Sequence, residues 1–128
     1  MFDVNGMTIT MTVGDTGAMK IRITGYELQT DDAVLFTVKT GNGSIMMDRV
    51  FTNKQDVPWD GRIESDNSII VCFHNSDTEG FSAGSYMWDI RVVINAYRNG
   101  EGVITDGDQV ITPYTPQTLV LQSPIGTV

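Results

Sequence analysis

The sequence has few of the residues that cross-link or interrupt a fold. Its 128 residues include one cysteine, one histidine and four prolines. The single thiol, Cys72, cannot form a disulfide within the chain, and nothing near it has the CxxC or Cys/His spacing of a zinc site. We therefore expect a buried, reduced thiol, no metal or other cofactor, and a fold held together by its hydrophobic core.

Positive charge is also scarce. Eight Lys and Arg stand against sixteen Asp and Glu, for a net charge of −8. Nucleic acid and anionic membrane surfaces are bound through basic patches, so neither is expected as a partner. No window approaches the roughly 18 apolar residues of a membrane span, and residues 1–6 lack the basic start and apolar run of a signal peptide. We expect synthesis in the cytoplasm and no membrane insertion.

Helical periodicity is missing as well. No stretch of ten or more residues repeats every 3.6 positions without glycine or β-branched residues. Apolar and polar residues instead alternate with the period of two that is typical of strands. Seven or eight short strands with regular turn signals predict an all-β, immunoglobulin-like antiparallel β-sandwich. The alternating segments are residues 7–13, 19–24, 33–39, 44–51, 68–74, 86–97 and 103–112.

The turn signals predict how these strands pair. Residues 7–13 and 19–24 are expected to be antiparallel neighbours, and Gly41-Asn42-Gly43 to close a hairpin between the next two strands. The Asn99-Gly100-Glu101-Gly102 turn is expected to return residues 103–112 onto the long strand, with an interruption at Asp106-Gly107-Asp108. Residues 68–74 have apolar residues on both faces, which is typical of an inner strand.

The chain is organised around the long strand that begins near Tyr86. Its even positions are apolar, so we predict Tyr86, Trp88 and Ile90 as core anchors, together with Phe36 from an earlier strand. In immunoglobulin-like sandwiches a tyrosine at this place bonds its hydroxyl back to upstream backbone, with a core cysteine two residues later. Tyr86 is expected to form such a corner, with Trp88 in the place of the cysteine.

A short helical turn is predicted just before this strand. Ser76 lies three residues ahead of Glu79, which is the spacing of a capping box. Gly80 and Gly84 follow at once, so the segment has room for about one turn and no more.

The composition changes after Thr112. Pro113, Pro116 and Pro124 surround an apolar run, and proline removes the amide donors that a central strand needs. We therefore divide the chain into a sandwich of residues 1–112 and an extended arm or edge strand of residues 113–128. Leu119, Val120 and Leu121 are the residues expected to contact another subunit.

No catalytic motif is present, and we do not expect an enzyme. Cys72 and His74 share a strand face, but positions two apart are separated by about 6.6–7 Å at their roots, and no acid or oxyanion loop frames them. Asp106 and Asp108 resemble a fragment of a calcium loop, as do Asp56 and Asp60. Neither pair has the EF-hand spacing, so a turn role is favoured.

The aromatic residues leave a second function open. Trp59, Trp88, Tyr97 and Tyr114 could together form a sugar-binding platform. Trp88 falls on the predicted core face, and Trp59 lies in the long loop of residues 52–66, where it can pin the loop to the core. Core packing and loop pinning are therefore favoured over the platform.

Three segments together carry a family resemblance. They are Val13-Gly14-Asp15-Thr16, the run Asp32-Ala33-Val34-Leu35-Phe36-Thr37-Val38-Lys39, and Ser76-Asp77-Thr78 followed by Phe81 and Gly84-Ser85-Tyr86-Met87-Trp88-Asp89-Ile90. In order and spacing they resemble small phage and prophage virion proteins that are similar to the N-terminal domain of the baseplate upper protein of Gram-positive phages. The resemblance covers about residues 5–112; the long loop of residues 52–66 and the tail from Pro113 depart from it.

The resemblance implies a non-enzymatic structural domain in a multi-copy tail or baseplate. Its partners would be further copies of itself or other virion proteins, and its location the virion, after synthesis in the bacterial host cytoplasm. It supplies no catalytic residues. The alternative is a carbohydrate-binding or adhesin-like β-sandwich module.

Overall fold

The computed structural model describes residues 2–52, 61–98, 100, 104–114 and 116–123. Of these residues, 59% lie in strands and 4% in helix, which confirms the predicted all-β class. The predicted roles of Trp59, Asp56 and Asp60, and most of the turn at residues 99–102, lie outside the described residues. No helix in the described ranges has the length and apolarity needed to cross a bilayer.

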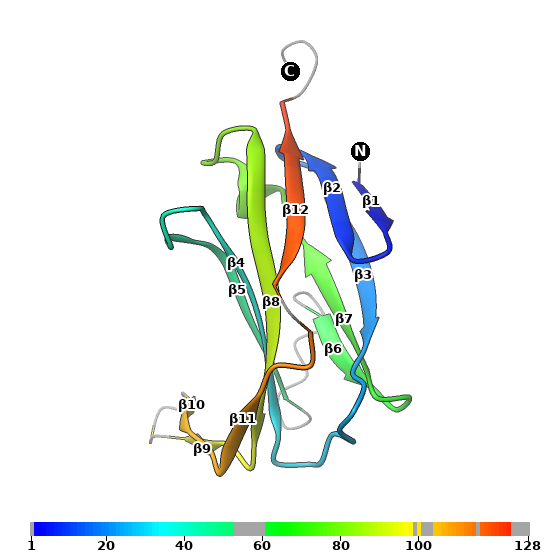
Figure 1. Cartoon of the computed structure of the whole chain (residues 1–128), viewed down its shortest axis with the longest axis vertical. Coiled ribbons are helices and arrows are strands. Elements are labelled where there is room, and N and C mark those ends of the chain that lie inside the picture. Colours follow the sequence, from blue (N-terminus) through cyan, green and yellow to red (C-terminus); the bar gives the residue numbers. More distant parts are fainter. Residues whose placement is uncertain (1, 53–60, 99, 101–103, 115, 124–128) are drawn as a thin grey trace.

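The larger of the two main sheets contains the long strand β8 (Gly84–Ile94) at its centre (Figure 1). One side of β8 pairs with β4 (Ala33–Lys39), which in turn pairs with β5 (Ile45–Thr52). The other side pairs with β11 (Gln109–Ile111) and then with β12 (Gln117–Gln122). The sheet is completed by β2 (Thr8–Thr12) and β1 (Phe2–Asn5). All neighbours are antiparallel except β2 and β12, which run parallel.

The smaller sheet has the order β3-β7-β6. It consists of β3 (Gly17–Arg22), β7 (Ser68–Phe73) and β6 (Gly61–Glu64), with β7 in the middle, as its two apolar faces predict. A separate ribbon pairs β9 (Tyr97–Arg98) with β10 (Ile104–Asp106). The only helix in the described residues is the single turn α1 (Asn75–Thr78).

The two sheets bury one core between them. All four predicted anchors are in it: Tyr86 is 9% exposed, Trp88 is 1% exposed, and Phe36 and Ile90 are fully buried. The Phe36 ring lies 5.5 Å from the Trp88 ring and meets Phe73 of the opposite sheet edge-on at 5.9 Å between centroids. Aromatic groups of this size dominate core energetics, so this cluster joins the two layers.

The predicted pairing of the first two strands is wrong. β2 and β3 belong to different sheets, and β2 pairs instead with β1, a strand that the alternation did not reveal. The turn at residues 13–16 carries the chain across the core. Each of the two strands then presents its apolar face to the same interior, and Ile9 and Met19 are both buried there.

The predicted arm or edge strand in the tail is also wrong for β12. This strand lies between β2 and β8, inside the sheet (Figure 1). Leu119 and Leu121 are 0% and 1% exposed and belong to the chain's own core, while the half-buried Val120 faces the other way. Pro113 and Pro116 precede β12 and do not interrupt it, so its hydrogen-bond ladder loses no donor. Residues 117–122 are therefore part of the sandwich.

Candidate functional site

The corner between β7 and β8 holds one of the three segments that carry the family resemblance. The helical turn α1 begins after His74, whose backbone N–H donates to the Asp77 carboxylate at 2.7 Å. The predicted capping box at Ser76 and Glu79 is therefore wrong by two residues. The capping box lies instead at His74 and Asp77, and Asp77 supplies the acid. Only one turn forms, as predicted.

Asp77 also fixes the corner to the larger sheet. Its second oxygen accepts a 2.6 Å hydrogen bond from the Arg49 guanidinium of β5, and the two side chains are only 10% and 15% exposed. An ion pair at this depth is screened less by water and salt than a surface pair. Arg49 therefore clamps α1 against β5.

A second link joins the corner to the start of the chain. The backbone N–H of Gly14 donates to Thr78 Oγ1 at 2.8 Å, and Thr78 is fully buried. Gly14 has a φ of 85°, a left-handed conformation that favours glycine. The Asp15 carboxylate accepts from the Thr12 N–H at 3.3 Å and closes the same turn.

Tyr86 closes the corner on the side of β8. Its hydroxyl donates to the Ser82 carbonyl at 2.5 Å, four residues upstream, which is the backward bond that the sequence predicts. The Phe81 ring packs edge-on against Tyr86, with 6.3 Å between ring centroids. The corner is thus a packed structural joint and not an open site.

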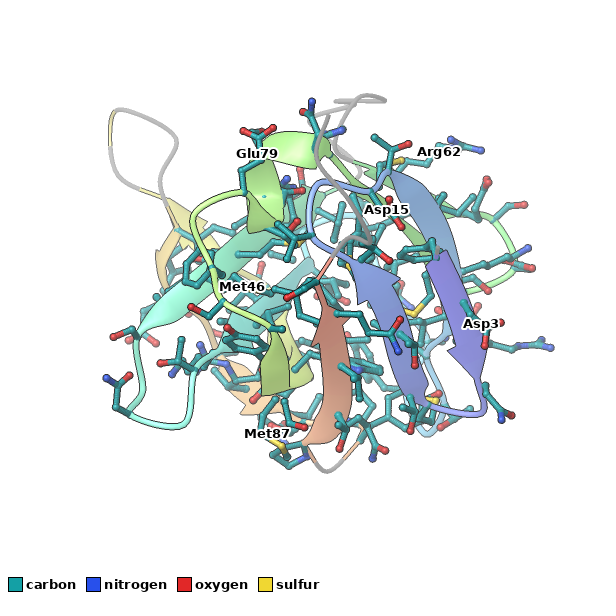
Figure 2. The ribbon with its side chains drawn as sticks, turned by 90° about the horizontal axis from the view of Figure 1, so that it is seen from above. Asp3, Asp15, Met46, Arg62, Glu79 and Met87 are labelled. Atoms are coloured by element: carbon teal, nitrogen blue, oxygen red, sulfur yellow. The ribbon has the colours of Figure 1, made fainter. Side chains whose placement is uncertain are left out.

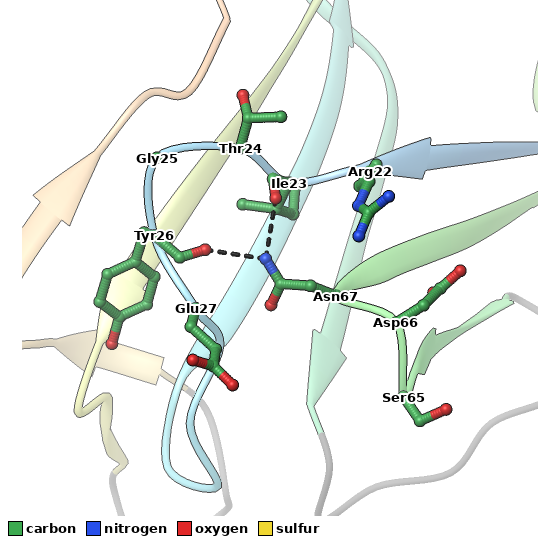
Figure 3. Close-up of a pocket in the computed structure, with 9 residues that line it drawn as sticks. All are labelled: Arg22, Ile23, Thr24, Gly25, Tyr26, Glu27, Ser65, Asp66 and Asn67. Carbon is green, nitrogen blue, oxygen red and sulfur yellow. Dashed lines mark hydrogen bonds between the residues drawn. The ribbon is translucent and has the colours of Figure 1, made fainter.

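A hollow lies at the other end of the small sheet, away from this corner. It has a volume of about 510 Å³ and lies between the segment after β3 and the turn from β6 to β7 (Figure 3). Its floor is Asn67, whose Nδ2 donates to the carbonyls of Ile23 and Tyr26, both at 2.8 Å. Asn67 Oδ1 accepts from the Leu28 N–H at 2.7 Å. All the hydrogen-bonding capacity of this amide nitrogen is used to shape the loop.

A buried carboxylate holds the same loop from the other side. Asp32 is 2% exposed, and one of its oxygens accepts from the Tyr26 hydroxyl and from the Gln29 N–H, both at 2.7 Å. The other accepts from the Asn95 N–H at 2.9 Å, which ties the loop to the end of β8. Desolvation, and then the hydrogen bond to Asp32, raise the pKa of Tyr26 to about 12. This phenol is therefore a fixed donor and not an acid-base group near neutral pH.

A second hollow of about 350 Å³ adjoins the first. The two share Glu27, Ser65 and Asn67, and the second extends to the apolar side chains of Leu28 and Ile63. Together they form a shallow groove lined by both polar and apolar side chains. Arg22 and Glu27 lie on opposite sides of Asn67 in Figure 3. The groove offers hydrogen-bond donors and acceptors but no nucleophile paired with a base.

The remaining residues considered from the sequence do not come together as a site. Cys72 forms no disulfide and is half-buried, less buried than expected, and His74 caps α1 with its backbone. Asp108 accepts hydrogen bonds from the Tyr97 hydroxyl and, at 2.9 Å, from the Asn95 side chain; the bond from Tyr97 and then the bond from Asn95 lower the pKa of Asp108. In the part of the chain that the structure describes, no group of three or more His, Cys, Asp or Glu residues is placed to hold a metal ion.

The aromatic platform is not assembled from the described aromatic residues. Trp88 is in the core and Tyr97 is on the β9–β10 ribbon, whereas the Tyr114 hydroxyl donates to the Arg22 carbonyl beside the groove. Sequence reasoning missed Asn67 and Asp32 as organising residues. The only local signal was their position next to predicted strands, where Asn and Asp are ordinary turn residues.

Comparison with known proteins adds no assignment, since no family model and no curated protein matches this chain.

Proposed function

We propose that this chain is a non-enzymatic structural module of a phage or prophage particle, of the tail or baseplate type. The observation that carries the proposal is that the resembling segments meet in space. Gly14 bonds directly to Thr78 across 64 positions of sequence, and the run at residues 33–39 pairs along β8. Residues that meet in one joint have a shared physical reason for appearing in a fixed order and spacing.

The strand order supports an immunoglobulin-like form of the sandwich. The orders β3-β7-β6 and β12-β8-β4-β5 correspond to B-E-D and G-F-C-C′ in that fold. The hydrogen bond from the Tyr86 hydroxyl to the Ser82 carbonyl lies at the corner that leads into β8, the strand that corresponds to F. Domains of this kind present large sheet faces and loop ends, which suits a building block of an assembly.

The test is the protein composition of particles. Phage induced from a host that encodes this chain would be purified by density gradient and analysed by quantitative mass spectrometry. We expect the chain at a fixed, multi-copy ratio to the other tail proteins. Particles that repeatedly lack it, while the lysate contains it, would refute the assignment.

One observation favours a second function, the binding of a saccharide in the groove. In the described ranges no side-chain bond or ion pair occupies the Glu27 carboxylate or the Arg22 guanidinium. Sugar hydroxyls both donate and accept, so a groove with both groups matches them chemically. A glycan array with wild type, Glu27→Ala and, as a control distant from the groove, Lys39→Ala would test this. Hits that Glu27→Ala removes and Lys39→Ala keeps would support it; an array without hits would exclude it for the glycans tested.

A further inference from the structure

The exposed apolar side chains are concentrated on one face of the molecule. The described residues include six large hydrophobic side chains that are exposed, and none of them lies on the small sheet. Five belong to strands of the large sheet, of which Val4 on the edge strand β1 lies beside the core residue Ile9. The other four are on the side away from the core: Ile45, Val50, Met87 and Val110, which are between 44% and 55% exposed. We call the outward side of β5, β4, β8, β11 and β12 the outer face.

The outward side of the small sheet is different. It carries charged pairs at the surface, between Lys20 and Asp66 at 2.8 Å and between Arg62 and Glu64 at 3.0 Å. Figure 2 shows Met87 and Arg62 on opposite sides of the sandwich. The small sheet thus has a charged outward side, whereas the outward side of the large sheet carries exposed apolar side chains among its charged ones.

The register of the strands places the outer-face residues in rows. Met87 lies beside Lys39 on one strand and Thr118 on the other, and Lys39 lies beside Ile45. The next row is acidic, with Asp48 and Asp89 on either side of Thr37.

A third row contains Val50, Leu35 and Arg91. The acidic row is therefore flanked by two apolar rows that each contain one cation. Within the described ranges, no ion pair or side-chain hydrogen bond engages Lys39, Asp89 or Arg91.

The charges on the outer face indicate which kind of partner can bind there. The whole chain has a net charge of −8, so two copies repel each other over most of their surface. The central rows of the outer face are balanced, with Lys39 and Arg91 against Asp48 and Asp89. We propose that the outer face is the interface of a two-fold dimer of this chain. In an isologous pair whose two-fold axis lies between the acidic row and the row of Lys39, that cation row of each copy meets the acidic row of the other, and each ion pair occurs twice.

The size and shape of the face suit a second sheet. β11 and β12 follow one another along the same edge of β8, so the face is four strands wide. Four strands about 4.8 Å apart and the 11 residues of β8, rising about 3.3 Å each, span at most roughly 19 by 36 Å, or about 690 Å². Stable interfaces bury about 600–1,000 Å² on each partner, so the face is near the lower end of that range. A shallow groove of about 380 Å³, lined by Lys39, Met87 and Pro116 among others, can receive an apolar side chain from the partner.

The test uses purified full-length chain in sedimentation velocity from about 1 to 100 µM. We expect wild type to form a dimer, and Met87→Lys and Val110→Lys each to weaken it by at least about 10-fold in Kd, because each places a charge in an apolar contact. Tyr97→Lys is the matched control. It is 49% exposed but lies on the β9–β10 ribbon, and it should leave the dimer unchanged. Circular dichroism checks that every variant is folded.

A charge exchange tests the same interface without altering its apolar contacts. Lys39→Asp and Asp89→Lys should each weaken self-association, and an equimolar mixture of the two should form a mixed dimer more tightly than either variant alone. Wild type that stays monomeric up to 100 µM would overturn the proposal. So would a dimer that Met87→Lys leaves intact or that Tyr97→Lys weakens equally. These experiments test self-association of the purified chain. A monomeric result would therefore overturn the dimer without deciding whether the chain is part of a phage particle, which the mass spectrometry of particles tests.

Discussion

Asn67 allows the sharpest test of how the groove end of the sandwich is held. It combines a left-handed backbone, with a φ of 66°, and three side-chain hydrogen bonds to the segment after β3. Replacing it with alanine removes all three bonds and leaves two carbonyls and one N–H without their partner. Replacing it with glycine removes the same bonds but also removes the steric cost of a left-handed backbone at this position. The two variants therefore separate the two contributions.

The expected magnitudes follow from the contacts. A hydrogen bond contributes about 0.5–1.5 kcal/mol net, and Asn67 is half-buried, so the loss of three bonds is expected to cost roughly 2–3 kcal/mol. A left-handed alanine costs about 1–2 kcal/mol more, whereas glycine loses about 0.5–1 kcal/mol through its flexibility in the unfolded chain. Asn67→Ala should therefore be less stable than Asn67→Gly by about 0.5–1 kcal/mol.

Urea denaturation followed by tryptophan fluorescence measures both differences. Asn95 provides a matched control because its φ is 50°, but its amide makes one exposed bond, to Asp108. Asn95→Ala should lose clearly less stability than Asn67→Ala, since only one bond is removed. Two results would contradict this role of the Asn67 side chain. One is an equal loss of stability in Asn67→Ala and Asn95→Ala, and the other is that Asn67→Gly is the least stable of the three variants.

Three other predictions follow from the core and its hydrogen bonds. Tyr86→Phe should cost about 0.5–1.5 kcal/mol and Trp88→Ala about 3–5 kcal/mol in urea denaturation, and midpoints equal to wild type would contradict the corner. Leu119→Ala should cost about 2–5 kcal/mol, because β12 is an inner strand; a loss below about 1 kcal/mol would mean that it is not. The pKa of about 12 for Tyr26 favours its protonated form in the folded state, so its contribution is full below pH 10 and is lost as the pH rises toward 12. Ultraviolet titration should show one tyrosine that deprotonates at about pH 12, and Asp32→Asn should return the pKa of Tyr26 toward 10.

Local sequence patterns predicted the parts of the fold that depend on near neighbours. The hairpin of β4 and β5 follows from alternation on both sides of a Gly41-Asn42-Gly43 turn. The burial of Trp88 and Ile90 follows from the period of two in β8. In each case the residues that determine the structure lie within a few positions of one another.

The errors concern which distant strands become neighbours. β3 pairs with β7, and β12 enters between β2 and β8, because these arrangements bury the inward apolar side chains of these strands in the core between the two sheets. No local pattern distinguishes them from a hairpin or an arm. The proline-rich composition of the tail was misleading for a related reason, since the effect of a proline depends on whether it falls inside a strand or beside it. The roles of Asn67 and Asp32 likewise depend on contacts from distant parts of the chain.

The place of β12 also affects the order in which the protein can fold during synthesis. Ile9 of β2 is paired with Leu119, which the ribosome adds about 110 residues later. Until then the paired β1 and β2 have no neighbour in the large sheet, and β8 presents an unpaired edge of the kind that recruits other strands. A nascent chain halted before residue 117 is therefore expected to be prone to aggregation, and completion of the large sheet must wait until β12 has left the ribosome.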